Sequence, residues 1–194
     1  VAHIHGGETT EGAIDEAIRH SITKMSHLHF VSTEIYGRRV IQMGEEPWRV
    51  TVSGAPSLDN LATFPLYSRE ELSERCGINL ASPTLLVTYH PVTLAYERTE
   101  AQTVELLAAL EEAKLNVIFT YPNSDTSGRK IIEMIQDFSA ENPRAQIATS
   151  LGTQGYFSVM SHVDAMVGNS SSGIIEAASF KLPVVNIGDR QKGR

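Results

Sequence analysis

The sequence has a single cysteine, Cys76, no long apolar run and no excess of basic residues. One cysteine excludes an internal disulfide framework and is typical of a reducing compartment. Since there is no apolar run of roughly 18 residues and no signal-peptide pattern, nothing predicts membrane insertion or export, and we expect a cytoplasmic protein. The formal net charge of −7 gives no general attraction to nucleic acid or to anionic membranes. Any anionic ligand must therefore be held by local groups.

The 194 residues, 41% hydrophobic and 20% charged, have the composition of an ordinary globular protein. The length allows one large core or two small lobes. The sequence begins with "VAHIHGGE", which resembles the end of a strand, and it ends with "NIGDRQKGR", just after another strand. We therefore expect this chain to be an internal segment of a longer protein.

From about Thr84, short apolar runs alternate with segments of helical spacing. Continuous runs such as "TLLVTY" and "NVIFTY" are typical of strands buried on both faces, and "TVELLAALEEA" has the period of a helix. Repeated strand–helix units predict an α/β fold with a doubly wound parallel sheet. The first part alternates similarly, and "APSLDNLATFPLYS" interrupts the pattern with two prolines. We predict two lobes, over residues 1–66 and 67–194.

"VGNSSSGIIE" (Val167–Glu176) places polar residues between a predicted strand and a predicted helix that begins at Gly173. Ligands of open α/β sheets bind at the carboxyl ends of strands, and a helix N-terminus favours anions. Glu176 would repel a phosphate but suits a diol, since a carboxylate accepts hydrogen bonds from adjacent hydroxyls. The pattern favours a nucleotide diphosphate with its ribose at Glu176. The alternative is a capped helix, for which one serine would suffice. The candidate phosphate-binding residues are Ser170, Ser171, Ser172 and Gly173.

Five of the seven histidines precede residue 30, and several lie close to acidic residues. On a strand His3 and His5 would share one face, and the Gly6–Gly7 pair allows a turn that brings Glu8 back toward His5. Three interpretations remain open. They are acid/base catalysis, a metal site, and a solvated strand edge with no chemistry. The remaining members of this group are Glu11, Asp15, Glu16, Arg19 and His20, with Asp15 and Arg19 one turn apart on a helix.

Other polar residues follow other predicted strands of the second lobe. His90 ends "TYH" and Asn123 lies in "FTYPNSDTSG", so both are expected at the edge of the sheet that holds the serines. Arg190, after the next strand, is a candidate cation for the diphosphate. Each of these residues alone has a structural explanation. Their concentration at successive strand ends favours a binding site.

Six motifs in this order carry a resemblance to a known family: "HIHGGE", "DEAIRHSITKMSHLHF", "HPVT", "PNSDTSG", "GNSSSGIIEA" and "PVVNIGDRQKGR". Together they resemble the hydrolysing UDP-N-acetylglucosamine 2-epimerases, over essentially the whole chain. Non-hydrolysing relatives have an acidic residue followed by Ala-Gly-Leu-Arg where this chain has His5-Gly6-Gly7-Glu8, which favours the hydrolysing branch. The resemblance implies two Rossmann-like lobes of GT-B type. Residues 1–66 would be the C-terminal part of the first, and residues 67–194 most of the second, nucleotide-binding lobe.

The resemblance also implies roles for individual residues. His5, Glu8 and Asp15 would carry the proton chemistry, and His90 would lie beside the leaving diphosphate. The reaction would convert UDP-N-acetylglucosamine to N-acetylmannosamine and UDP, by elimination to a glycal and hydration, and would feed sialic (nonulosonic) acid synthesis. It needs no redox cofactor and no catalytic metal. The substrate-binding residues would be Arg19, His90, Asn123, Ser170, Ser171, Ser172, Gly173, Glu176 and Arg190.

Other functions share part of this pattern. A non-hydrolysing UDP-sugar 2-epimerase or a GT-B glycosyltransferase would have a similar nucleotide site, a metal-dependent hydrolase would be built on His3 and His5, and a nucleotide-sugar sensor would bind UDP without turnover. The exact sugar stays open, because related enzymes act on diacetamido sugars. The expected partners are a UDP-sugar and, from the resemblance, further copies of the chain in a homodimer or higher homo-oligomer.

Overall fold

The computed structural model describes residues 1–11, 14–80, 83–92, 97–123 and 128–194. The chain forms two compact units. The first unit contains Val1–Thr63 together with Asp189–Arg194, and the second unit contains Phe64–Gly188. We call Asp189–Arg194 the returning segment, because the chain comes back to the first unit there. The predicted lobes, over residues 1–66 and 67–194, differ from these units in where they place this segment and residues 64–66.

The first unit alternates strands and helices around a three-stranded parallel sheet with the order β1-β2-β3. Helix α3 was not predicted, because Pro56 and Pro65 were interpreted as a break in the pattern. Pro56 is the first residue of α3, where its missing amide hydrogen costs no intrahelical hydrogen bond. The elements are β1 (Ala2–Ile4), α1 (Asp15–Lys24), β2 (Leu28–Val31), α2 (Glu34–Gln42), the short helix η1 (Pro47–Arg49), β3 (Val50–Val52) and α3 (Pro56–Thr63).

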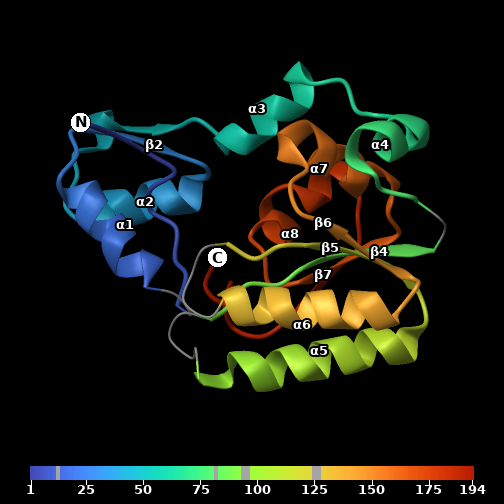
Figure 1. Cartoon of the computed structure of the whole chain (residues 1–194). Helices are drawn as coiled ribbons and strands as arrows, with labels where there is room; N and C mark the ends of the chain where they lie inside the picture. Colours follow the sequence, from blue (N-terminus) through green and yellow to red (C-terminus); the bar gives the residue numbers. More distant parts are fainter. Residues whose placement is uncertain (12–13, 81–82, 93–96, 124–127) are drawn as a thin grey trace. The chain divides into compact units, whose positions relative to one another are not determined.

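The second unit has a five-stranded parallel sheet with the order β6-β5-β4-β7-β8 (Figure 1). The chain builds outward from β4 through β5 to β6, then continues with β7 on the other side of β4. This reversal makes a topological switch point between β4 and β7, the place where doubly wound sheets bind ligands. The elements are α4 (Arg69–Cys76), β4 (Thr84–Thr88), α5 (Thr99–Ala113), β5 (Asn116–Thr120), α6 (Gly128–Glu141), β6 (Ala145–Ala148), α7 (Gly152–His162), β7 (Ala165–Gly168), α8 (Ser172–Ile175), η3 (Ala177–Phe180) and β8 (Val184–Asn186).

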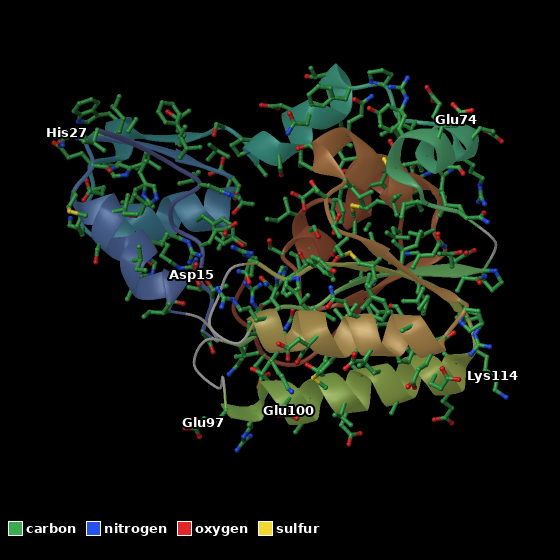
Figure 2. The ribbon with its side chains drawn as sticks, in the orientation of Figure 1. Asp15, His27, Glu74, Glu97, Glu100 and Lys114 are labelled. Atoms are coloured by element: carbon green, nitrogen blue, oxygen red, sulfur yellow. The ribbon has the colours of Figure 1, made fainter. Side chains whose placement is uncertain are left out.

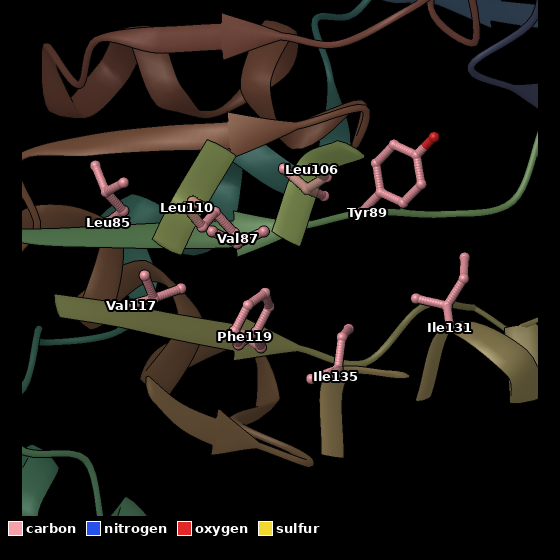
Figure 3. Packing of buried hydrophobic residues seen from close by; sticks show 9 residues of the cluster. All are labelled: Leu85, Val87, Tyr89, Leu106, Leu110, Val117, Phe119, Ile131 and Ile135. Atoms are coloured by element: carbon pink, nitrogen blue, oxygen red, sulfur yellow. The ribbon is translucent and has the colours of Figure 1, made fainter. Parts of the chain in front are cut away.

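The core of the second unit lies between the sheet and the helices on its faces. Helices α5 and α6 cover one face, and α7 lies on the other (Figure 1). On the α5/α6 side, alternate residues of β4 and β5 pack with apolar residues of both helices (Figure 3). This core cluster consists of Leu85, Val87, Tyr89, Leu106, Leu110, Val117, Phe119, Ile131 and Ile135.

The prediction of an α/β fold with parallel sheets is confirmed. Among the described residues, no helix is both long and apolar enough to cross a membrane.

Gly168, the last residue of β7, pairs with Thr88 at the switch point. Its φ is +144°, and a Cβ there would lie 2.0 Å from the carbonyl oxygen of Thr88. The contact is with backbone, which has little freedom to move. We therefore predict that Gly168→Ala lowers the free energy of unfolding by about 3 kcal/mol, from backbone strain and overpacking together. Urea denaturation of the variant measures this loss.

Gly77→Ala is the matched control for this prediction. Gly77 also lies in the second unit and has a positive φ of +67°, but nothing lies within 4 Å of its Cβ position. This variant should therefore lose about 1 kcal/mol, from the left-handed conformation alone. Equal losses in the two variants would show that space beside Thr88 is not the limiting factor at Gly168.

Candidate active site

Asn169 joins the carboxyl ends of β4 and β7 at the switch point. Its main-chain amide donates to the Thr88 carbonyl oxygen (3.1 Å). Its side chain makes two bonds to the main chain of His90, since Oδ1 accepts from the amide (2.7 Å) and Nδ2 donates to the carbonyl oxygen (2.8 Å). Asn169 is 1% exposed, so these bonds are shielded from water. The backbone of His90 is therefore fixed at the point where a doubly wound sheet binds its ligand.

The imidazole of His90 is oriented by Asn123. The main-chain amide of Asn123 donates to His90 Nδ1 at 3.0 Å, so Nδ1 is unprotonated. In the neutral ring the proton is then on Nε2, which becomes a hydrogen-bond donor. We predicted a side-chain amide contribution from Asn123. The structure shows its main-chain amide in a positioning contact with His90, and its side chain is exposed.

The turn that follows β7 and carries Ser170, Ser171 and Ser172, which we call the serine turn, belongs to a chain of hydroxyl groups that starts in the sheet. Thr120 and Thr88, which are paired in register, share a hydrogen bond of 2.7 Å. Thr88 Oγ1 lies 3.5 Å from Tyr156 Oη, and Tyr156 Oη lies 2.7 Å from Ser172 Oγ, which in turn lies 2.9 Å from Ser170 Oγ. Burial raises the pKa of Tyr156, so it stays a phenol that can donate.

Sequence reasoning missed Tyr156, Thr88 and Thr120. The two threonines have a signal, because the strands "TLLVTY" and "NVIFTY" both end in Thr-Tyr. Tyr156 has none, since its place depends on how α7 packs against the sheet. A cavity of about 210 Å³ adjoins this network at the ends of β5 and β6. Its lining includes Thr120, Tyr121, Ala148, Thr149, Ser150 and Tyr156.

The helix expected from Gly173 is split into two short pieces. Helix α8 has four residues, and the 3-10 helix η3 follows Glu176. The amides of residues 172–176 are all hydrogen-bonded within the turn. In the described part of the chain, the amides of Ser170 and Ser171 make no hydrogen bond. The donors offered to a ligand are therefore these two amides and the serine hydroxyls, rather than the end of a long helix.

Glu176 lies at the junction between α8 and η3 and is 8% exposed. Burial is the main cause of the raised pKa of Tyr156, and the negative charge of Glu176 raises that pKa further. Within the residues that the structure describes, its carboxylate makes no hydrogen bond and no ion pair. Buried acceptors normally have partners, so an unpartnered carboxylate beside the serine turn is suited to bind hydroxyl groups of a ligand.

In the first unit, β1 ends at Ile4 and His5 has a left-handed backbone with φ +68°. His5 therefore lies outside the strand, and the expectation that strand alternation aligns it with His3 was wrong. Gly7 has φ +80°, and a Cβ there would lie 2.4 Å from the carbonyl oxygen of Tyr36. The turn thus requires glycine. A non-glycine residue at positive φ stores strain, which is common at functional sites.

This turn buries the carboxylate of Glu8, which is 3% exposed. Oε2 forms an ion pair with Nη2 of Arg194, from the returning segment. Oε1 lies 3.2 Å from Nε2 of His5, although the angle is not that of a hydrogen bond. Arg19 Nη1 donates to the main-chain carbonyl oxygen of Glu8 (3.2 Å), and Arg39 donates to that of Gly7. Arginines therefore surround the turn that carries this carboxylate.

The structure brings His5, Glu8, Asp15 and Arg19 around one cavity of about 320 Å³. Asp15 is the exposed first residue of α1 (Figure 2), and Arg19 lies one turn further along. Burial lowers the pKa of Arg19, and the charges of Glu8 and Asp15 oppose this effect. Arg194 was not predicted as a member of this group. The complete lining is His3, Ile4, His5, Glu8, Asp15, Ile18, Arg19, Ile22 and Arg194.

The other histidines of this unit have structural contacts. His3 Nδ1 lies 3.0 Å from Thr23 Oγ1, and burial lowers the pKa of the His3 imidazole. His29, 1% exposed, contacts Glu45 at 3.1 Å, and Lys24 pairs with the same carboxylate. His20 lies 3.7 Å from Glu16, and Figure 2 shows His27 far from Asp15 within the unit. Across the described ranges, no group of three or more histidine, cysteine or acidic side chains is arranged to hold a metal ion.

Arg190 lies in the returning segment, which packs in the first unit. Its predicted contact with a diphosphate stays a prediction.

The family profile described as UDP-N-acetylglucosamine 2-epimerase matches residues 1–194, which is the whole chain. The chain belongs to this family.

The chain is 44% identical over 196 residues to the GDP/UDP-N,N'-diacetylbacillosamine 2-epimerase (hydrolyzing) of Campylobacter jejuni, with 100% of this chain and 51% of the relative covered. The UDP-N,N'-diacetylbacillosamine 2-epimerase (hydrolyzing) of Legionella pneumophila is 40% identical, with 100% and 51% covered. Polysialic acid biosynthesis protein P7 of Escherichia coli is 41% identical, with 99% and 49% covered. This chain therefore spans about half the length of the relatives it matches.

Solved structures share the fold of this epimerase-family chain. The UDP co-structure of S. aureus MnaA has a TM-score of 0.77 at 16% identity, with 98% of this chain and 51% of that one covered. The UDP-GlcNAc 2-epimerase of Neisseria meningitidis, bound to UDP-GlcNAc, has a TM-score of 0.77 at 20% identity, with 98% and 53% covered. At these sequence identities the likeness establishes the fold, and it assigns no role to individual residues.

Proposed function

We propose that the intact protein is a hydrolysing 2-epimerase of a UDP-linked 2-acetamido sugar. The observation that carries the proposal is the cavity of the first unit, where His5, the buried carboxylate of Glu8 and the carboxylate of Asp15 lie together. An imidazole and two carboxylates supply both a base and an acid, which an epimerisation through elimination and hydration requires.

In the proposed reaction, a base in this cavity removes the proton from carbon 2 of the sugar while the bond between carbon 1 and the UDP oxygen breaks. The electron pair of the C–H bond becomes the double bond of a glycal, and UDP leaves with the electrons of the C–O bond. Water then adds at carbon 1, and a proton returns to carbon 2 from the opposite face. His5, Glu8 and Asp15 are the proposed proton-transfer groups, and Arg19 binds the substrate near them.

The leaving diphosphate is proposed to bind at the switch point of the second unit. Nε2 of His90 is a hydrogen-bond donor in the neutral ring, because Nδ1 accepts from the main-chain amide of Asn123. The amides of Ser170 and Ser171 and the hydroxyl of Ser172 provide further donors, with Gly173 in the same turn and Arg190 as a proposed cation. Fixed donors stabilise an anion as its charge develops. Glu176 is proposed to accept the two ribose hydroxyls.

The identity of the sugar has two candidates. The family description names UDP-N-acetylglucosamine, for which the free product would be N-acetylmannosamine, a precursor of sialic (nonulosonic) acids. The names of the Campylobacter and Legionella relatives favour UDP-N,N'-diacetylbacillosamine, which has a second acetamido group. The comparison of kcat/KM for the two nucleotide sugars decides between them.

NMR of the intact enzyme with each nucleotide sugar in deuterated water tests the proposal. We expect UDP and a free epimerised sugar with deuterium at carbon 2. Epimerised sugar still linked to UDP would instead indicate a non-hydrolysing epimerase. Turnover that requires a sugar acceptor would indicate a glycosyltransferase, and binding of UDP without any product would indicate a sensor.

A further inference from the structure

The carboxylate of Glu8 is buried and has a contact at each oxygen. Arg194 pairs with Oε2, and His5 lies 3.2 Å from Oε1. An unpaired buried carboxylate is strongly disfavoured, so such a group either finds a cation or becomes protonated. The orientation of this carboxylate therefore depends on the groups that face it, which are His5, Arg19, Tyr36 and Arg194.

The surrounding cations have different partners. Arg19 and Arg39 donate to the main-chain carbonyl oxygens of Glu8 and Gly7, so they hold the turn rather than the carboxylate. Lys192 pairs with the exposed Glu11 at 3.0 Å. In the described part of the chain, Arg194 supplies the direct arginine contact to the carboxylate of Glu8.

Arg194 is itself held in place. Its Nη1 donates to Oε1 of Gln191 at 2.9 Å, and Gln191 is 4% exposed. The returning segment is anchored to the loop after the turn, because the amide of Glu11 donates to the Lys192 carbonyl oxygen (3.0 Å) and the hydroxyl of Thr9 donates to that of Gly193. The guanidinium is thus directed at Glu8 by contacts on both sides of it.

We propose that Arg194 is a positioning residue for the proton chemistry. It pairs with Oε2 of Glu8 and so fixes the carboxylate, with Oε1 turned toward His5 at the cavity. This inference rests on the proposed function, because it assigns Arg194 to the same reaction. Arg194 belongs to the first unit, whereas the serine turn, which is proposed to bind the nucleotide, belongs to the second.

Steady-state kinetics of the intact enzyme test this role. Arg194→Gln should lower kcat by about 100-fold, the usual size of an effect from a displaced catalytic group, while KM for the nucleotide sugar changes less than about threefold. Arg194→Lys keeps the charge and should retain kcat within about tenfold of the wild type. Lys192→Gln, the matched control, removes a cation of the same segment whose partner is exposed, and it should leave kcat unchanged.

Rescue by lysine separates positioning from a merely structural role, because lysine restores the cation but not the planar guanidinium. A normal kcat in Arg194→Gln would overturn the proposal, as would equal losses of kcat in Arg194→Gln and Arg194→Lys. So would a large rise in KM with normal kcat, which would instead assign Arg194 to binding of the diphosphate.

The double variant Glu8→Gln/Arg194→Gln keeps the proposal testable if Arg194→Gln is unstable. Removing both partners leaves no unpaired buried charge, so its Tm should recover relative to Arg194→Gln, and additive losses in Tm would contradict the pairing. A wild-type enzyme that turns over no nucleotide sugar would sink the proposed function. The pairing would then still be decided by the Tm comparison of the single and double variants.

Discussion

Replacing Glu8 by glutamine is expected to lower kcat about 1,000-fold, within the range that general acid–base groups contribute. Glutamine keeps the shape of the side chain but neither accepts nor releases a proton at this position. It also leaves the guanidinium of Arg194 without its anion and the ring of His5 without its neighbour. Release of UDP and incorporation of deuterium at carbon 2 should therefore be lost together in the intact enzyme.

Glu11→Gln is the matched control. Glu11 lies three residues further along the same segment, is exposed and pairs with Lys192. Its replacement should leave kcat unchanged. If Glu8→Gln retained kcat within about fivefold of the wild type, Glu8 would be excluded as a proton-transfer group, because such groups contribute at least about 100-fold. Circular dichroism spectra of both variants verify that the fold is retained.

Replacing Glu176 by alanine is expected to raise KM for the nucleotide sugar by about 100-fold or more. Two hydrogen bonds from hydroxyls to a buried carboxylate are worth roughly 3 kcal/mol or more together, and about 1.4 kcal/mol corresponds to a factor of 10. The ribose does not react, so kcat should fall less than KM rises. Calorimetric titration with UDP measures the same loss without turnover.

Two further variants sharpen this result. Glu176→Gln keeps one carbonyl acceptor and should be intermediate between the wild type and alanine. Glu74→Ala removes an exposed carboxylate of α4 in the same unit (Figure 2) and should leave UDP affinity unchanged. If 2'-deoxy-UDP bound to the wild type as tightly as UDP, Glu176 would not hold the ribose diol, whatever the effect of the alanine variant.

Local sequence patterns predicted the parts of the fold that depend on neighbours in the chain. The apolar runs before Tyr89 and Tyr121 predicted buried parallel strands, and the carboxyl ends of parallel strands necessarily meet at one edge. The prediction therefore placed His90 and the serine turn at one edge of the sheet, as the structure does. Their roles with a ligand remain predictions.

Contacts between distant parts of the chain were not accessible in this way. Tyr156 meets Ser172 through the packing of α7 behind the sheet, which no spacing in the sequence encodes. The left-handed backbone of His5 depends on the turn that follows it, and strand periodicity gave the wrong orientation. Arg194 reaches Glu8 across 186 residues, so the sequence identified Glu8 as a candidate without its cation and without its burial.

The return of the chain to the first unit has a consequence for biosynthesis. A ribosome adds about 5 to 20 residues per second, so roughly 10 to 40 s separate the synthesis of Glu8 from that of Arg194. During this interval the nascent first unit has no arginine at position 194 to balance its buried carboxylate. The last steps of its folding must then wait until the second unit has been made, and the pairing of Glu8 is completed only in molecules in which both units are present.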